Sequence, residues 1–151
     1  MTPEQVKLIK LSFVPLMSRK LEAGKLFYQR LFEIAPETRS MFKPDIDAQA
    51  EKLMQTLGLA ISSLNDMPTL LGMLKSLGRQ HVAYGVKEEH YAKVGAALLW
   101  TLEKMLGDAF TDEARIAWTD LYKTVAAVMY DASQETDSRN DSTPRVAAAR
   151  K

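Results

Sequence analysis

Two histidines are the only imidazoles in this chain of 151 residues, and the sequence places them in different surroundings. His81 follows Leu70, Leu74 and Leu77 at helical spacing, so a helix would turn its ring toward the core. A histidine in that place can be a core residue satisfied by a backbone carbonyl, or it can be an axial ligand of iron. His90 stands at an expected helix start, where we expect it to be exposed.

A metal site at His81 could not be built from side chains alone. Such a site needs three or four converging ligands, and the chain has no cysteine and no carboxylates that share the inward face of His81. If His81 binds a metal, a cofactor must therefore supply the other ligands. A porphyrin supplies four nitrogens, so this interpretation points to haem.

The sequence lacks the motifs that would indicate hydrolysis or phosphate binding. It contains no G-x-S-x-G, no glycine-rich phosphate loop and no H-E-x-x-H. The acidic pairs Glu88-Glu89 and Asp112-Glu113 fall at expected helix starts, where the helix dipole explains them. Methionines could ligate haem or line a binding groove, but four of them have the helical spacing that is typical of core residues: Met54, Met73, Met105 and Met129.

The apolar spacing is helical over almost the whole chain, and no segment shows sustained strand-like alternation. Pro15 is expected to bend or end the first helix. For residues 37–47 the sequence predicts a short helical turn and a loop. The expected helices cover about 2–18, 20–34, 48–65, 67–85, 88–106 and 111–132. The sequence therefore predicts an all-α domain.

The composition of the chain restricts its binding partners, its location and the extent of its folded domain. Twenty basic and nineteen acidic residues argue against binding to nucleic acid or to an anionic membrane surface. The longest uncharged stretch, 53–65, is too short for a membrane span. The lack of cysteine fits a reducing cytoplasm. Residues 133–151 are polar apart from Val146 and a few alanines, so we expect a disordered tail outside a domain of residues 1–132.

Several local patterns occur in the order found in one known family. They are Leu26-Phe27-Tyr28, Pro36-Glu37-x-x-x-Met41-Phe42, Gln49-x-x-x-Leu53, Gly78-Arg79-Gln80-His81-x-x-x-Gly85-Val86, His90-Tyr91-x-x-Val94-Gly95 and Ala117-Trp118-x-x-x-Tyr122. Together they make residues 1–132 resemble a globin, and most of all bacterial single-domain haemoglobins and the haem domain of flavohaemoglobins. The resemblance implies a globin fold, with six to eight helices around a pocket for haem b.

The resemblance also implies roles for individual residues. His81 matches the proximal ligand of the haem iron, and Phe42 the phenylalanine that stacks on the porphyrin. Tyr28 and Gln49 match the distal pair that hydrogen-bonds oxygen, and Leu53 the apolar distal wall. The other implied haem contacts are Leu57, Leu77, Val86, Tyr91 and Val94. From spacing alone, Tyr28 could instead be a core tyrosine and Gln49 a solvated residue.

The function implied by the resemblance is reversible binding of dioxygen, and of carbon monoxide or nitric oxide, by a monomer or weak homodimer. The alternative is an enzyme that consumes nitric oxide or peroxide with electrons from a separate reductase. Tyr91 matches a tyrosine that joins the proximal histidine to a glutamate in flavohaemoglobins, but Ser133 stands at the glutamate position, and Gln80 replaces a lysine that is frequent there. A helical interaction protein without cofactor is a third hypothesis.

Overall fold

The computed structural model describes residues 1–42, 44–83 and 85–142, and over these ranges the chain is helical without a strand. The elements are α1 (Pro3–Ser18), α2 (Lys20–Ile34), η1 (Pro36–Met41), α3 (Ile46–Ser62), α4 (Met67–Ala83), α5 (Glu88–Leu106), η2 (Gly107–Ala109) and α6 (Asp112–Ser142), where η denotes a 3-10 helix. The predicted all-α class is confirmed. Among the described residues, no helix combines the length and apolar character that crossing a membrane would require.

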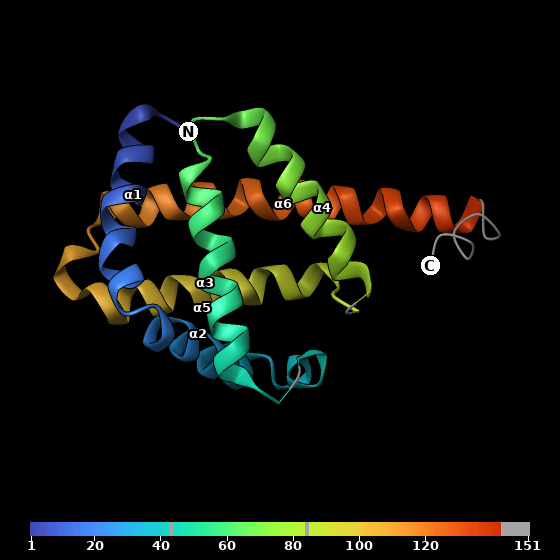
Figure 1. The fold of residues 1–151 in the computed structure, drawn as a ribbon, viewed down its shortest axis with the longest axis horizontal. Helices are drawn as coiled ribbons and strands as arrows, with labels where there is room; N and C mark the ends of the chain where they lie inside the picture. The colour runs from blue at the N-terminus through green and yellow to red at the C-terminus, as the bar shows by residue number, and fades with distance from the viewer. Residues whose placement is uncertain (43, 84, 143–151) are drawn as a thin grey trace.

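The helices cross one another around two apolar clusters. Helices α5 and α6 run alongside each other, and α3 and α4 cross them (Figure 1). Helix α4 packs on α6, while α2 packs on both α3 and α5. The larger cluster is built around Ile9, Phe13, Leu74, Leu102 and Trp118. The buried members of the smaller cluster are Phe27, Tyr28, Leu31, Ala35 and Ala97.

Two glycines let helix pairs approach closely. A Cβ atom on Gly24 of α2 would lie 2.6 Å from the Cβ of Ala50 on α3. A Cβ atom on Gly78 of α4 would lie 2.8 Å from the Cα of Met129 on α6. Both distances are shorter than carbon atoms tolerate, so a side chain at either position would push the helices apart.

Helix α1 contains Pro15, where the sequence predicted either a bend or an end. The helix begins as expected, with a capping box between Thr2 and Gln5. It then continues through Pro15 to Ser18 instead of ending. Proline leaves the carbonyl of residue 11 without its helical partner, and both Pro15 and Leu11 are exposed, so water can hydrate that carbonyl.

Helix α6 continues past the expected domain boundary. We expected order to end near Ser133, but the helix runs on to Ser142 and its last turns project beyond the other helices (Figure 1). Extending an existing helix adds a backbone hydrogen bond for each residue fixed, which is less costly than starting a new helix. Ser133 itself is buried, and its hydroxyl donates to the carbonyl of Tyr130. Residues 143–151 of the expected tail lie outside the described residues.

Removing residues 136–151 is expected to shift the melting temperature by no more than about 2 °C, because this polar segment offers little apolar area to bury. Calorimetry of the shortened chain measures this. A control that ends after Tyr130 also loses the buried residues Ala132 and Ser133, and should melt clearly earlier. Equal losses in both variants would place the end of the domain beyond Glu135.

Candidate functional site

His81 lies in the last turn of α4, and a backbone hydrogen bond fixes its ring. Its Nδ1 is 2.6 Å from the carbonyl oxygen of Leu77. Because a carbonyl only accepts, Nδ1 carries the hydrogen and Nε2 carries the lone pair that metal coordination uses. Burial lowers the pKa of His81, an effect opposed by the Leu77 carbonyl and reinforced by the charge of Lys52. The ring is therefore neutral at neutral pH, the form that binds metals.

The chain immediately after His81 is held by a turn that needs glycine. Gly85 has a φ of 79°, a left-handed conformation that side chains disfavour. The turn directs the backbone N–H of Val86 to the carbonyl of His81, at 3.3 Å. This bond supports the end of α4, where the carbonyls of a helix would otherwise lack partners.

Tyr28 is a buried residue in apolar surroundings. Its ring packs edge-on against Phe27 and Phe42, with centroids 5.0 and 5.1 Å away, and lies 5.9 Å from Phe32. Within the described residues the hydroxyl has no hydrogen-bond partner, and burial raises the pKa of Tyr28 to about 12. The hydroxyl therefore stays protonated and can donate to a ligand.

Gln49 and Leu53 lie one turn apart on α3, beside the close crossing of Gly24 and Ala50. Gly24 is one turn before Tyr28 on α2, so the crossing brings Leu53 into the smaller cluster with Tyr28. Gln49 is half-buried, and its side chain makes no hydrogen bond within the described residues. The amide is thus not committed to a structural bond.

The other predicted haem contacts line the margins of the two clusters, except Val86, which belongs to neither. Leu57, Leu77 and Tyr91 pack against the larger cluster. Phe42 and Val94 pack against the smaller one, as Leu53 does. Of the ten predicted residues only Tyr28 is fully buried, and the other nine are half-buried. Apolar side chains that contact the core yet keep exposed surface suit a flat, apolar cofactor laid against them.

These residues fit haem by the chemistry of their donors. In the part of the chain that the structure describes, no group of three or more histidine or acidic side chains could hold a metal ion. His81 offers one nitrogen ligand, fixed in the correct tautomer. A macrocycle that brings its own four nitrogens is the form of iron that such a site can hold.

Tyr91 is placed differently from a hydrogen-bonded relay residue. Its hydroxyl is buried without a partner among the described residues. Its ring packs edge-on against Tyr130, and its backbone carbonyl accepts the hydroxyl proton of Tyr122. The ring of Tyr122 occupies the space where Gly95 lacks a side chain.

The expectation that His90 is exposed is wrong. His90 is only 5% exposed, and its Nδ1 accepts the backbone N–H of Lys87 at 2.9 Å. Its Nε2 lies 3.8 Å from a carboxylate oxygen of Glu37 on η1. The imidazole therefore caps α5 and ties it to η1, a role that the neighbouring acidic residues concealed in the sequence.

Sequence reasoning missed two residues of the site. Lys52 is exposed on α3, yet its charge acts on His81 of α4, a proximity that only the folded chain reveals. Leu98 of α5 contacts both clusters and joins them. Its position on the inward stripe was the available signal, but that stripe does not distinguish a core residue from a residue beside a cofactor.

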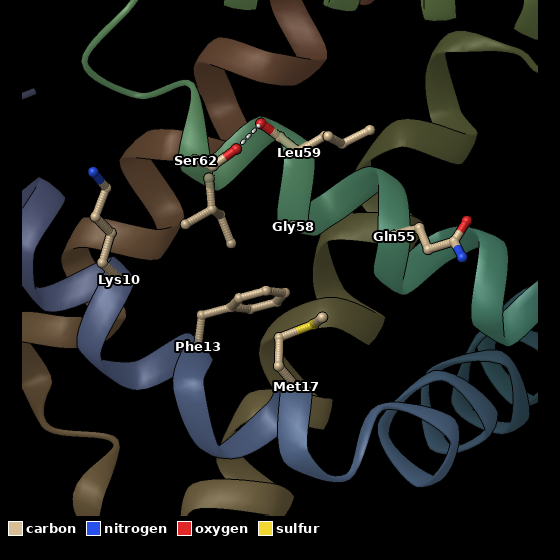
Figure 2. A pocket seen from close by; sticks show the side chains of 8 residues that line it. Lys10, Phe13, Met17, Gln55, Gly58, Leu59 and Ser62 are labelled. Atoms are coloured by element: carbon tan, nitrogen blue, oxygen red, sulfur yellow. Dashed lines mark hydrogen bonds between the residues drawn. The ribbon is translucent and has the colours of Figure 1, made fainter.

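A hollow lies between α1 and α3, and none of the candidate site residues lines it. Figure 2 shows Phe13 and Met17 of α1 facing Gly58 of α3, while the side chains of Gln55 and Leu59, which also line the hollow, point away from α1 in this view. At 100° per residue, Gly58 lies on the opposite side of α3 from Gln49. The hollow is therefore independent of the candidate haem contacts.

The fold and the site together define an all-α protein with a half-buried histidine whose Nδ1 is hydrogen-bonded to a backbone carbonyl. The family model of the globins matches residues 25–129. The neuroglobin of Chaenocephalus aceratus is 35% identical over 137 residues, which cover 82% of this chain and 86% of that protein. The neuroglobin of Tetraodon nigroviridis is 34% identical over the same coverage. The chain belongs to the globin family.

A solved structure agrees with this fold. A hexacoordinated heme protein from an anhydrobiotic tardigrade superposes with a TM-score of 0.81, covering 89% of this chain and 96% of that one. Its sequence identity of 18% limits the likeness to the fold. The two relatives named above are neuroglobins, so they give no support to the bacterial or flavohaemoglobin subclass that the sequence suggested.

Proposed function

We propose that this globin holds haem b through His81 and binds dioxygen reversibly. The observation that carries the proposal is the bond from His81 Nδ1–H to the Leu77 carbonyl, which orients a neutral ring for coordination through Nε2. When bound, haem supplies a ferrous iron that takes up diatomic gases such as dioxygen, carbon monoxide and nitric oxide. Membership of the globin family supports the same assignment.

The protein's own contribution on the gas-binding side is a pair of donors in apolar surroundings. The Tyr28 hydroxyl is protonated and lacks a partner among the described residues, and the Gln49 amide is half-buried. Phe42 and Leu53 supply apolar surface beside Tyr28 and limit competition by water. A donor in such a place stabilises a gas that accepts hydrogen bonds more than one that does not.

The proposal does not depend on the bacterial subclass. That assignment rests on the sequence patterns around Tyr28 and Gln49, whereas the relatives named above are neuroglobins. We also propose a cytoplasmic location, which the absence of cysteine supports.

Reconstitution with haemin tests the proposal. The purified chain should take up one haem, and the reduced protein should change its absorption spectrum with oxygen and recover it when the oxygen is removed. A protein that takes up no haem, or that oxidises at once without reversible gas binding, would contradict the proposal.

Tyr28→Phe and Gln49→Leu are each expected to speed oxygen dissociation by roughly 3- to 30-fold. A neutral hydrogen bond contributes about 0.5–1.5 kcal/mol net, and more in a dry site. If both donors share one oxygen atom, the double variant should show less than the sum of the two effects. Stopped-flow dissociation measures this.

Carbon monoxide is the matched control for these variants, because it is a poorer acceptor and its dissociation should change less. Unchanged oxygen dissociation in all three variants would show that neither side chain faces the gas. An effect of Tyr28→Phe alone would make Gln49 a solvated residue.

Nitric oxide or peroxide consumption with a separate reductase remains the second candidate, and the site favours it less. The relay expected through Tyr91 needs an acid, yet Ser133 stands at that position and donates to a backbone carbonyl. The acids nearest to it on α6, Asp131 and Glu135, are both exposed. Turnover of nitric oxide with a supplied reductase separates the two functions.

A further inference from the structure

The hollow between α1 and α3 has the size and the lining of a small-molecule site. Its volume is about 750 Å³, within the range of ligand pockets, and most of its lining is apolar. Phe13 and Met17 face Gly58 across it (Figure 2), and Ile61 also lines it. Met17 is 38% exposed and Leu59 is 61% exposed. Large apolar side chains left open to solvent around a concave surface are typical of a place where something binds.

Gly58 keeps the hollow open. Glycine inside a helix is destabilising relative to alanine, so its presence in the middle of α3 needs a reason. A Cβ atom there would lie 3.8 Å from Cε2 of Phe13 and 4.0 Å from Cε of Met17, which are ordinary contacts. Close helix crossing, the reason for Gly24 and Gly78, therefore does not explain Gly58. Its missing side chain leaves space between α1 and α3.

Lys10 brings one uncompensated positive charge to this apolar lining. It is the one charged residue among the described residues that line the hollow, and it is half-buried. Residues 53–65, which include the facing part of α3, carry no charge, and the one acid of α1 is Glu4. Within the described part of the chain, Lys10 forms no ion pair. The hollow therefore complements a negative charge.

Two occupants made of this chain itself lack that charge complementarity. Residues 143–151 contain three basic side chains and no acidic one, and α6 leads toward them at the end of the molecule opposite to α1 (Figure 1). A second copy placed on the hollow by a two-fold axis would bring identical patches together, so Lys10 would face the same cation again. The observations therefore favour a small anionic ligand.

We propose that the hollow binds a long-chain carboxylate, with its alkyl chain against Phe13, Met17 and Gly58 and its carboxylate paired with Lys10. Lys10 lies toward the Ser62 end of the hollow, so one end offers a cation and the rest offers apolar contact (Figure 2). An anion that carries its own apolar chain uses both features, whereas a small inorganic anion uses only the ammonium. No candidate haem contact lines the hollow, so the proposal is independent of the proposed function.

Calorimetric titration of the full chain with dodecanoate tests the proposal. The chain should bind one dodecanoate with a Kd of about 1 mM or tighter, whether or not haemin has been added first. Dodecyltrimethylammonium, which has the same chain and a positive head group, should bind at least about tenfold more weakly. No binding of dodecanoate up to about 5 mM, or equal binding of both amphiphiles, overturns the proposal.

Lys10→Gln should weaken dodecanoate binding by about 3- to 10-fold, since it removes a partly exposed charge pair and keeps most of the side chain. Lys7→Gln is the matched control, because it makes the same change one turn earlier on α1 at an exposed residue outside the hollow. It should change the Kd less than about twofold. Equal weakening in both variants would mean that the overall charge of α1, and not a pair with Lys10, attracts the anion.

Gly58→Leu fills the hollow and should weaken dodecanoate binding by at least about tenfold. Gly72→Leu adds the same side chain at an exposed helix glycine with nothing within 4 Å, and should bind as the wild type does. Circular dichroism confirms that each variant is folded. Should Gly58→Leu fail to fold, Gly58→Ala, whose Cβ fits without a clash, should still weaken binding measurably.

Two outcomes would place the ligand or the hollow elsewhere. Wild-type affinity in a folded Gly58→Leu or Gly58→Ala variant, or a change in the haem spectrum as dodecanoate binds, would mean that the carboxylate occupies another site. A wild-type dimer in sedimentation velocity that Gly58→Leu converts to a monomer would make the hollow an interface between copies. Either result overturns the proposal and leaves the assignment of His81 intact.

Discussion

His81→Ala is expected to lose tight haem binding and, with it, much of the stability of the holoprotein. The variant removes the one imidazole that a backbone bond orients as a ligand. A ligand at a thousandfold excess over its Kd stabilises the folded state by about 4 kcal/mol. For a domain of this size the melting temperature should then fall by about 8–16 °C. Haem titration followed by absorbance, with calorimetry of the same samples, measures both effects.

The second histidine provides the control for this prediction. His90→Asn removes the ring that caps α5 but keeps a side chain able to accept the Lys87 N–H. It should lower stability modestly and keep wild-type haem affinity. Haem retention in His81→Ala, or an equal loss of haem in His90→Asn, would contradict the assignment of His81.

Most helices could be predicted from the sequence because their apolar stripes are long and their ends carry clear signals. Thr2 and Pro3 mark the start of α1, and the paired acids Glu88 and Glu89 mark the start of α5. The sequence left open whether Pro15 bends or ends α1, because whether a proline ends a helix depends on whether water reaches the carbonyl that it leaves unpaired. That exposure is a property of the packed molecule.

The candidate site, like the fold, could be predicted from the sequence only in part. The inward position of His81 follows from its stripe, but the bond from Nδ1 to Leu77 that fixes its tautomer is a matter of side-chain conformation. His90 looked like a surface residue because its sequence neighbours are charged. Its Nε2 lies beside Glu37 of η1, which is more than fifty residues away in the chain. Contacts of that kind are set by tertiary packing and leave no local pattern.

Gly78→Ala is expected to destabilise the protein strongly, although alanine is the better helix former. The new Cβ would lie 2.8 Å from the Cα of Met129, so the backbones of α4 and α6 must separate. Overpacking of this kind costs about 1–3 kcal/mol, and more where backbone rather than a side chain must move. Because Gly78 lies one turn before His81, the same displacement should move the iron ligand and speed haem dissociation. Denaturant unfolding and haem transfer to an acceptor protein measure the two effects.

Gly72→Ala, the same substitution two turns earlier on α4, isolates the cause. A Cβ atom there meets nothing within 4 Å, and the position is exposed. Alanine should therefore stabilise the helix by about 0.5–1 kcal/mol, since glycine loses more backbone freedom on folding. The free energies of unfolding of the two variants should differ by about 1.5–4 kcal/mol, one lying below and the other above that of the wild type. If neither substitution changed the free energy of unfolding, the α4–α6 crossing would accommodate a Cβ atom at Gly78. The close approach at Gly78 would then not be what positions His81.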